Sequence, residues 1–223
     1  MERAAVDATR ALERDWWFNA VAVLVRPRRV FTALRDDSED AIEARQEPIT
    51  AIVVLAGIAI VLATNVAGQL LDEHAYDGVL IAVWAFFAGA IYGFASYWFA
   101  GFALYLGQRG AGTLAKARPA RHVLAYAAVP LIVWLALVWP VRLAFYGTDL
   151  FRTGGGDDHA GRFAFDAIAV VFALWAAGLL AFGLRTRYEW DWRRSAVALS
   201  LAIAAFALLG FAAALILRGS HHS

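Results

Sequence analysis

The side chains that could do chemistry in this sequence gather in two short polar segments. The first segment contains Asp72, Glu73, His74 and Asp77, and the second contains Asp157, Asp158 and His159 after three glycines at 154–156. Carboxylates and imidazoles can hold a divalent cation, but neither segment has two histidines four residues apart or the ligand spacing of a calcium loop. We therefore expect two solvated loops, with no metal site and no cofactor.

Nucleophilic and lysine-based chemistry has few candidates in the chain. Cysteine is absent, Lys116 is the single lysine, and no G-x-S-x-G motif occurs. The glycine run also lacks the Gly-Lys-Ser/Thr ending of a phosphate-binding loop. A net charge of +1 provides no basic field for nucleic acid to follow. We expect a protein that is not an enzyme and does not bind nucleic acid.

The two polar segments lie between apolar stretches that are long enough to cross a membrane. The 223 residues are 61% hydrophobic and 17% charged, whereas a soluble domain is about 45–50% apolar and about 25% charged. A membrane helix needs about 20 apolar residues. Five stretches qualify: 49–71, 78–106, 123–147, 163–184 and 195–217. Because the runs are continuous and too long for barrel strands, they predict an all-α, polytopic membrane protein with five transmembrane helices.

The basic residues predict the orientation of these spans. Of the 20 Lys and Arg residues, 16 fall in the segment before the first span and in the loops after the second and fourth spans. Positively charged loops remain on the cytoplasmic side. We therefore expect a multi-pass protein of the cell membrane, with a cytoplasmic N-terminal segment (1–48) and an outer tail (218–223).

The N-terminal segment predicts an amphipathic helix over about 15–35, interrupted at Pro27. Such a helix can lie in the headgroup plane, with indoles at the boundary and guanidiniums on anionic lipids. The residues expected to contact the membrane surface or a partner are Trp16, Trp17, Arg26, Arg28 and Arg29. The alternative is that this helix packs under the bundle as an anchor. An acidic linker with six carboxylates follows at 36–47 and predicts a solvated connector.

Small residues in the second span predict close helix packing. Gly89 and Gly93 form a GxxxG motif, and Gly101 lies eight residues further on. Such stripes let two helix backbones approach. The neighbour is either another helix of the same chain or a second copy, which would make a homo-oligomer.

Polar residues inside the predicted spans are compatible with a second function, a conduit for a small solute. Asn65 and Gln69 fall in the first predicted span, and Tyr92, Ser96 and Tyr97 in the second. A cavity lined by these five would suit a small-solute transporter or channel. No ionisable group lies near a span centre, which argues against ion-coupled transport.

Two charged residues near the outer ends of neighbouring spans predict an ion pair. Arg142 belongs to the third span and Asp166 to the fourth. Pairing would relieve two charges at the hydrocarbon boundary. Arg162 and Asp149 are the competing partners.

Three short pieces of sequence resemble one known family. They are the Pro-centred basic stretch Val23–Arg35, the Gln46-Glu47-Pro48 entry into the first span, and Val123–Pro130, which places Tyr126 shortly before Pro130. With five spans behind an amphipathic segment, this resembles the Yip family, membrane proteins named for interaction with Ypt/Rab GTPases, including its prokaryotic members. The resemblance implies an integral membrane protein without catalysis that shapes membranes or scaffolds partners.

One departure limits what the resemblance implies. The acidic Asp-Leu-Tyr-Gly-Pro element of eukaryotic relatives does not occur ahead of the first span, so GTPase binding is not carried over. The leading hypothesis is a non-enzymatic membrane organiser or scaffold that acts through its arginine-rich cytoplasmic face. The second is the conduit between the first and second spans.

Overall fold

The computed structural model describes residues 14–64, 67–72, 78–153 and 160–219. Within these residues every regular element is helical. The longer helices are α4 (Gln46–Leu62), α5 (Gly78–Gly110), α6 (Ala117–Ala127), α7 (Val129–Tyr146), α8 (Ala160–Tyr188) and α9 (Trp192–Gly219). The shorter ones are a helix at 14–22, α2 (Pro27–Ala33), α3 (Glu39–Ala44), and the 3₁₀ helices η1 (Ala67–Gln69) and η2 (Gly147–Phe151).

Five helical segments are long and apolar enough to span a membrane, which confirms the predicted fold class. Each of the five extends beyond its predicted range at one end or both, and α5 is a single helix of 33 residues. The first span was predicted too long, because α4 ends at Leu62 and a separate 3₁₀ turn follows at Ala67–Gln69. Gln69, predicted to lie in this span, is therefore on η1 and outside the spanning helix.

The third span is broken near the start of its predicted range. α6 ends at Ala127, α7 begins at Val129, and Pro130 occupies the first turn of α7. Proline has no N–H to donate, and its ring clashes with the carbonyl four residues earlier, so it fits a helix start better than a helix interior. Pro140, by contrast, lies within α7 without ending it.

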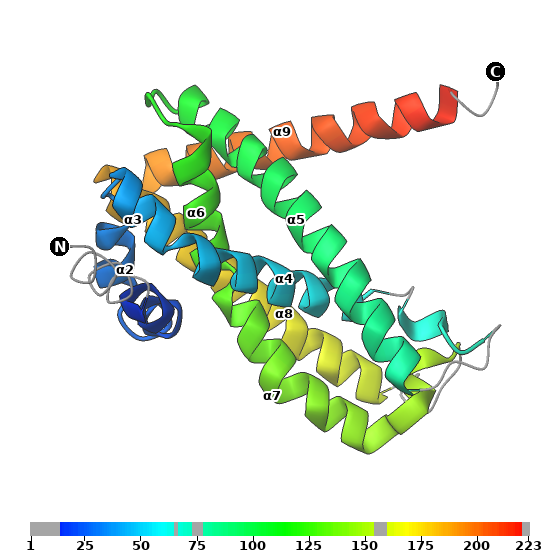
Figure 1. The fold of residues 1–223 in the computed structure, drawn as a ribbon. Helices are drawn as coiled ribbons and strands as arrows, with labels where there is room; N and C mark the ends of the chain where they lie inside the picture. Colours follow the sequence, from blue (N-terminus) through cyan, green and yellow to red (C-terminus); the bar gives the residue numbers. More distant parts are fainter. Residues whose placement is uncertain (1–13, 65–66, 73–77, 154–159, 220–223) are drawn as a thin grey trace.

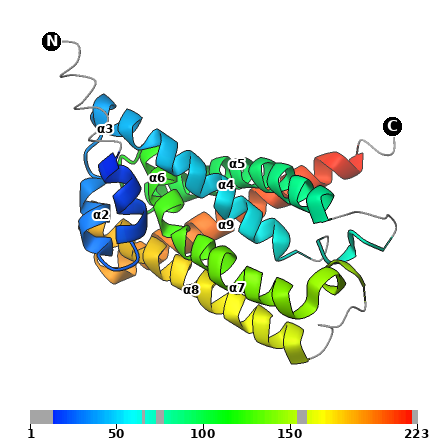
Figure 2. The ribbon, with the colours of Figure 1, turned by 60° about the horizontal axis from the view of Figure 1, so that its bottom comes forward.

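The helices form a bundle around α4 (Figures 1 and 2). α4 packs against α5 on one side and α7 on another, and α7 pairs with α8. α9 starts beside the end of α8, contacts α5 and then runs away from α7 and α8 toward the C-terminus. The far part of α9 is largely uncovered, with Ile203 and Leu208 70% and 68% exposed.

Glycines set the distance between α4 and α5. A Cβ atom built on Gly57 of α4 would lie 2.1 Å from the carbonyl oxygen of Gly89 and 2.6 Å from the Cα of Gly93. A Cβ on Gly93 would lie 2.3 Å from the carbonyl oxygen of Val53. The GxxxG motif therefore contacts a helix of the same chain, and its partner position is Gly57.

The larger of two hydrophobic clusters lies at the end of the bundle that carries the N-terminal segment. Val23, Phe31 and Leu34 from that segment are fully buried there. They pack in the same cluster as Tyr126 of α6 and Leu184 of α8. The segment ahead of the first span is thus part of the core.

Candidate functional site

Most of the described basic side chains lie at one end of the bundle, which we call the arginine-rich end. It is formed by α2, α3, the start of α6 and the junction between α8 and α9 (Figure 1). Arg194 at that junction donates through Nε to the carbonyl of Ala111 and through Nη2 to that of Gly112, both at 2.9 Å. Hydrogen bonds therefore join the loop after α5 to the junction between α8 and α9, two basic loops that the sequence predicts to lie on the same side of the membrane.

Trp16 lies inside this end and not on its surface, which corrects the sequence-based prediction. Its side chain is 6% exposed and its ring centroid is 5.7 Å from that of Tyr126. The guanidinium of Arg45 lies 5.3 Å from the centre of the Trp16 ring. Because the 14–22 helix turns this indole toward α4 and α6, Trp16 anchors the segment, whereas Trp17 is 45% exposed.

Arg26, Arg28 and Arg29 are exposed, as a surface role requires. They flank Pro27 at the start of α2. Large apolar side chains on the preceding helix are also exposed, among them Phe18 at 66% and Val21 at 68%. Cationic and apolar side chains therefore share one exposed surface, which is the composition of a helix that lies at a lipid headgroup boundary.

The acidic linker is not simply a solvated connector. It forms α3, capped by Ser38, whose hydroxyl accepts from the N–H of Ala41. Asp37 joins two helices: Arg187 of α8 donates through Nη2 to both of its carboxylate oxygens at 2.9 and 3.1 Å, and Arg45 lies 3.7 Å from Oδ1. We call this arrangement the Asp37 bridge.

Sequence reasoning missed two fully buried polar side chains, Arg45 and Gln108. Arg45 is fully buried, and its Nη2 donates to the carbonyl of Asp36 at 2.9 Å while Nε and Nη1 have no hydrogen-bond partner among the described residues. Gln108, also fully buried, accepts from the Tyr188 hydroxyl at 3.0 Å. Arg45 gave no sequence signal because it sits among six linker carboxylates that suggest exposure.

A polar groove lies between α2 and the last turns of α8, with a volume of about 500 Å³. Arg28 and Thr32 line it from α2, and Arg35 from the turn after α2. Arg185, Thr186 and Glu189 line it from the end of α8. The groove therefore collects three guanidiniums and one carboxylate.

An unusual backbone conformation positions the carboxylate of this groove. Glu189 has a φ of 54°, in the left-handed region that favours glycine at the end of a helix. Arg35 pairs with Glu189 at 2.6 Å and also donates to the carbonyl of Thr186. The N–H of Trp190 donates to the carbonyl of Arg185 at 3.1 Å. Two carbonyls at the end of α8 are thereby satisfied.

The prediction that Asn65, Gln69, Tyr92, Ser96 and Tyr97 line one polar cavity is wrong. Asn65 lies outside the described residues, Gln69 is exposed on η1, and Tyr92 is 45% exposed. Only Ser96 and Tyr97 border a cavity, because α4 ends before Gln69 and the α5 surface bearing Tyr92 turns away.

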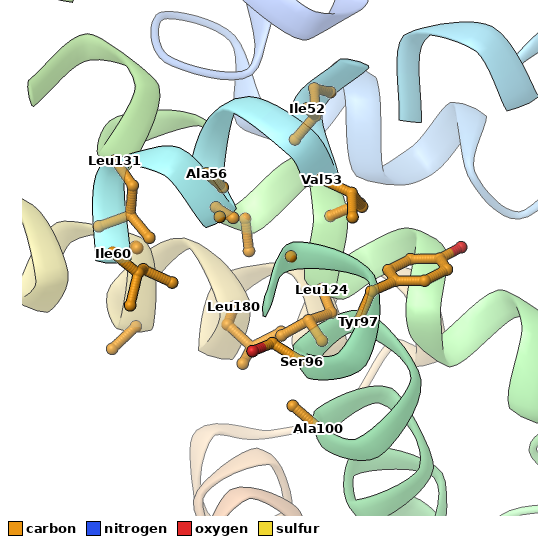
Figure 3. Close-up of a pocket in the computed structure, with 17 residues that line it drawn as sticks. Ile52, Val53, Ala56, Ile60, Ser96, Tyr97, Ala100, Leu124, Leu131 and Leu180 are labelled. Atoms are coloured by element: carbon orange, nitrogen blue, oxygen red, sulfur yellow. The ribbon is translucent and has the colours of Figure 1, made fainter. Parts of the chain in front are cut away.

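That cavity is apolar and has a volume of about 240 Å³. Aliphatic side chains from α4, α5, α7 and α8 line it, such as Ile52, Ala100, Leu131 and Leu180. Figure 3 shows the Tyr97 hydroxyl pointing away from these side chains. The lining of this cavity therefore offers water or a polar solute few hydrogen-bonding groups.

The other predicted contacts are found within the chain. Gly101 packs on the side chain of Arg121, whose guanidinium lies 3.8 Å from the ring centre of Trp98. Arg142 lies 3.9 Å from Asp166, and Arg162 lies 3.8 Å from the same carboxylate. The predicted pair and its competitor thus occur together.

The two loops at the far end of the bundle are partly described. Thr153 donates to Asp72 through its N–H at 2.8 Å and through its hydroxyl. These two hydrogen bonds hold the pKa of the Asp72 carboxyl below its ordinary value. The other acidic and histidine residues of the two loops lie outside the described residues, and the described ones contain no group of three metal-binding side chains.

Comparison with known proteins identifies the family. The family model described as the Yip1 domain matches residues 21–214, from the N-terminal segment to α9. No curated protein and no solved structure matches the chain. The match includes α2, the five spanning segments and most of the arginine-rich end. This multi-pass membrane protein therefore belongs to the Yip1 domain family.

Proposed function

We propose that the chain is a non-enzymatic membrane organiser that acts through its arginine-rich end. The observation that carries the proposal is the exposed surface of Arg26, Arg28 and Arg29 beside the exposed apolar side chains of the 14–22 helix. A surface of this kind attracts anionic lipids by about 1 kcal/mol for each arginine close to the headgroups. It would gather anionic lipid around the bundle.

The burial of Trp16 supports this proposal, because it fixes where the surface lies. The 14–22 helix and α2 are attached to the core by Trp16, Val23 and Phe31, which are 6%, 0% and 0% exposed. The arginines are thus presented from a rigid base at the end of the spanning helices. A positioned cationic surface selects lipids without losing the conformational entropy of a flexible tail.

A cytoplasmic location of the arginine-rich end is part of the proposal and follows from the positive-inside rule. Anionic lipids are concentrated in the cytoplasmic leaflet, where they attract basic segments next to membrane helices. The apolar lining of the cavity beside Ser96 and Tyr97 favours this role over a conduit. GTPase binding is not proposed.

Lipid selectivity in a reconstituted bilayer tests the proposal. The full chain is placed in vesicles of mixed phosphatidylcholine and phosphatidylglycerol, and spin-labelled lipids report which headgroup associates with the protein. We expect a preference for phosphatidylglycerol that salt weakens and that a triple change of Arg26, Arg28 and Arg29 to Gln removes. Arg152→Gln, at the far end, is the matched control and should leave the preference unchanged. Equal association of the two lipids with the unmodified chain would refute the proposal.

A further inference from the structure

The groove between α2 and α8 differs in kind from the surrounding arginine-rich surface. Arg26 and Arg29 are exposed on α2 or next to it and do not line the groove, whereas Arg28 lines it from α2 and Arg185 from α8. A volume of about 500 Å³ falls within the range of about 300–1,000 Å³ that small-molecule sites occupy. The shape therefore fits one bound molecule.

The charges of the groove select an anion. Glu189 is the one carboxylate in the lining, and its ion pair with Arg35 at 2.6 Å neutralises both groups. Arg28 and Arg185 remain, and neither has an ion pair within the part of the chain that the structure describes. Arg185 stacks on the Trp192 ring at 4.9 Å, which orients its guanidinium. Two guanidiniums suit the oxygens of a phosphate group.

The end of α8 would repel an anion through its unsatisfied carbonyls, but two of them already have donors. The carbonyl of Thr186 accepts from Arg35, and that of Arg185 accepts from the N–H of Trp190. The hydroxyl of Thr32, an exposed residue, adds a neutral donor on the α2 side. The Thr32 hydroxyl can therefore donate to a ligand, whereas the carbonyls of Arg185 and Thr186 already accept hydrogen bonds from the protein.

The position of the groove favours a lipid as the source of that phosphate. Phe182, which belongs to the spanning part of α8, lines the groove one turn before Arg185. The lining thus passes from an apolar side chain to guanidiniums along one helix, as a phospholipid does from acyl chain to headgroup. Basic pockets next to spanning helices are common sites for anionic lipid headgroups.

We propose that this groove binds the phosphate of one anionic phospholipid, held between Arg28 and Arg185. The inference rests on the proposed function, because it assigns one specific lipid site within the arginine-rich end. It adds a stoichiometry and a location: one lipid, between α2 and α8. Occupancy would join the two elements through a shared anion.

Binding of a short-chain lipid to the full chain in neutral detergent tests the site. Native mass spectrometry counts dioctanoyl phosphatidylglycerol bound at increasing concentration, with dioctanoyl phosphatidylcholine as the neutral comparison. We expect one saturable phosphatidylglycerol. Arg28→Gln or Arg185→Gln should weaken it about tenfold, and the double variant about a hundredfold, because each removes a charge-assisted hydrogen bond. Arg28 has an exposed side chain, so the Arg28→Gln variant keeps the fold.

The matched control is the double variant Arg26→Gln and Arg29→Gln, which loses the same charge at the same end but leaves the groove intact. It should bind the single lipid within about twofold of the unmodified chain. Equal weakening by the control pair, or unchanged binding by the groove pair, overturns the groove while leaving the bilayer selectivity of the proposed function in place.

Two soluble probes distinguish a lipid from a free anion. Inorganic phosphate and sn-glycerol 3-phosphate are added to the complex with dioctanoyl phosphatidylglycerol. Displacement only at concentrations far above that of the lipid supports a lipid site, because the acyl contacts near Phe182 are lost. Displacement by inorganic phosphate at an equal concentration overturns the lipid assignment.

Discussion

The close approach of α4 and α5 makes a sharp prediction for Gly57→Ala. The new Cβ would lie 2.1 Å from the carbonyl oxygen of Gly89, and 2.6 and 2.7 Å from the Cα and N of Gly93. All three are backbone atoms, so no side chain can rotate away. Relief requires the helices to separate by roughly 1 Å, and a mismatch of this kind costs about 1–3 kcal/mol.

We expect the loss to lie at the upper end, about 3 kcal/mol, because the separation also opens the contact at Gly93. The free energy of unfolding in mixed micelles, measured by a denaturing-detergent titration, gives the value. Gly178→Ala in α8 is the matched control, since a Cβ there has nothing within 4 Å. It should change stability by less than about 1 kcal/mol. A Gly57→Ala protein as stable as the Gly178→Ala protein would refute the packing.

Three further changes test the Asp37 bridge and the far loops. Asp37→Asn should lower the free energy of unfolding by about 2 kcal/mol, because it leaves the buried cation of Arg45 without its carboxylate. Arg45→Met should cost less than about 1 kcal/mol in the same titration, since it removes the buried charge itself while Asp37 keeps Arg187. A larger loss for Arg45→Met than for Asp37→Asn would reverse this assignment. Asp72 has a folded pKa below the ordinary value of 3.8, so its bonds to Thr153 should be complete above pH 3.8 and lost as the pH falls through the lower folded value. The protection factor of the Thr153 amide against hydrogen exchange should fall in that window, and protection independent of pH would contradict the pairing.

The spans could be predicted because length and continuous hydrophobicity determine them locally. The ends of α5 and α9 were misplaced by a few residues, since helices continue into the headgroup region where hydropathy no longer marks them. Pro130 was visible in the sequence, but whether a proline starts a helix or sits inside one depends on packing, as Pro140 in α7 shows.

The candidate site was only half predictable. Exposed arginines follow from composition and charge, and Arg26, Arg28 and Arg29 are exposed, while their contact with a membrane or a partner stays a prediction. Trp16 and Trp17 are adjacent, and sequence alone cannot tell which of two neighbouring indoles faces the core. The groove was missed because Arg28 and Arg185 are far apart in the chain and meet only through the packing of α2 on α8.

The Asp37 bridge has a mechanical consequence. One carboxylate, in the connector between α2 and α3, is shared by Arg45, which lies between α3 and α4, and by Arg187 of α8. A partner that lifted the N-terminal segment would separate Asp37 from both cations and uncover the Trp16 indole at the same moment. A pull on the segment would therefore reach α8 and the start of α4 together.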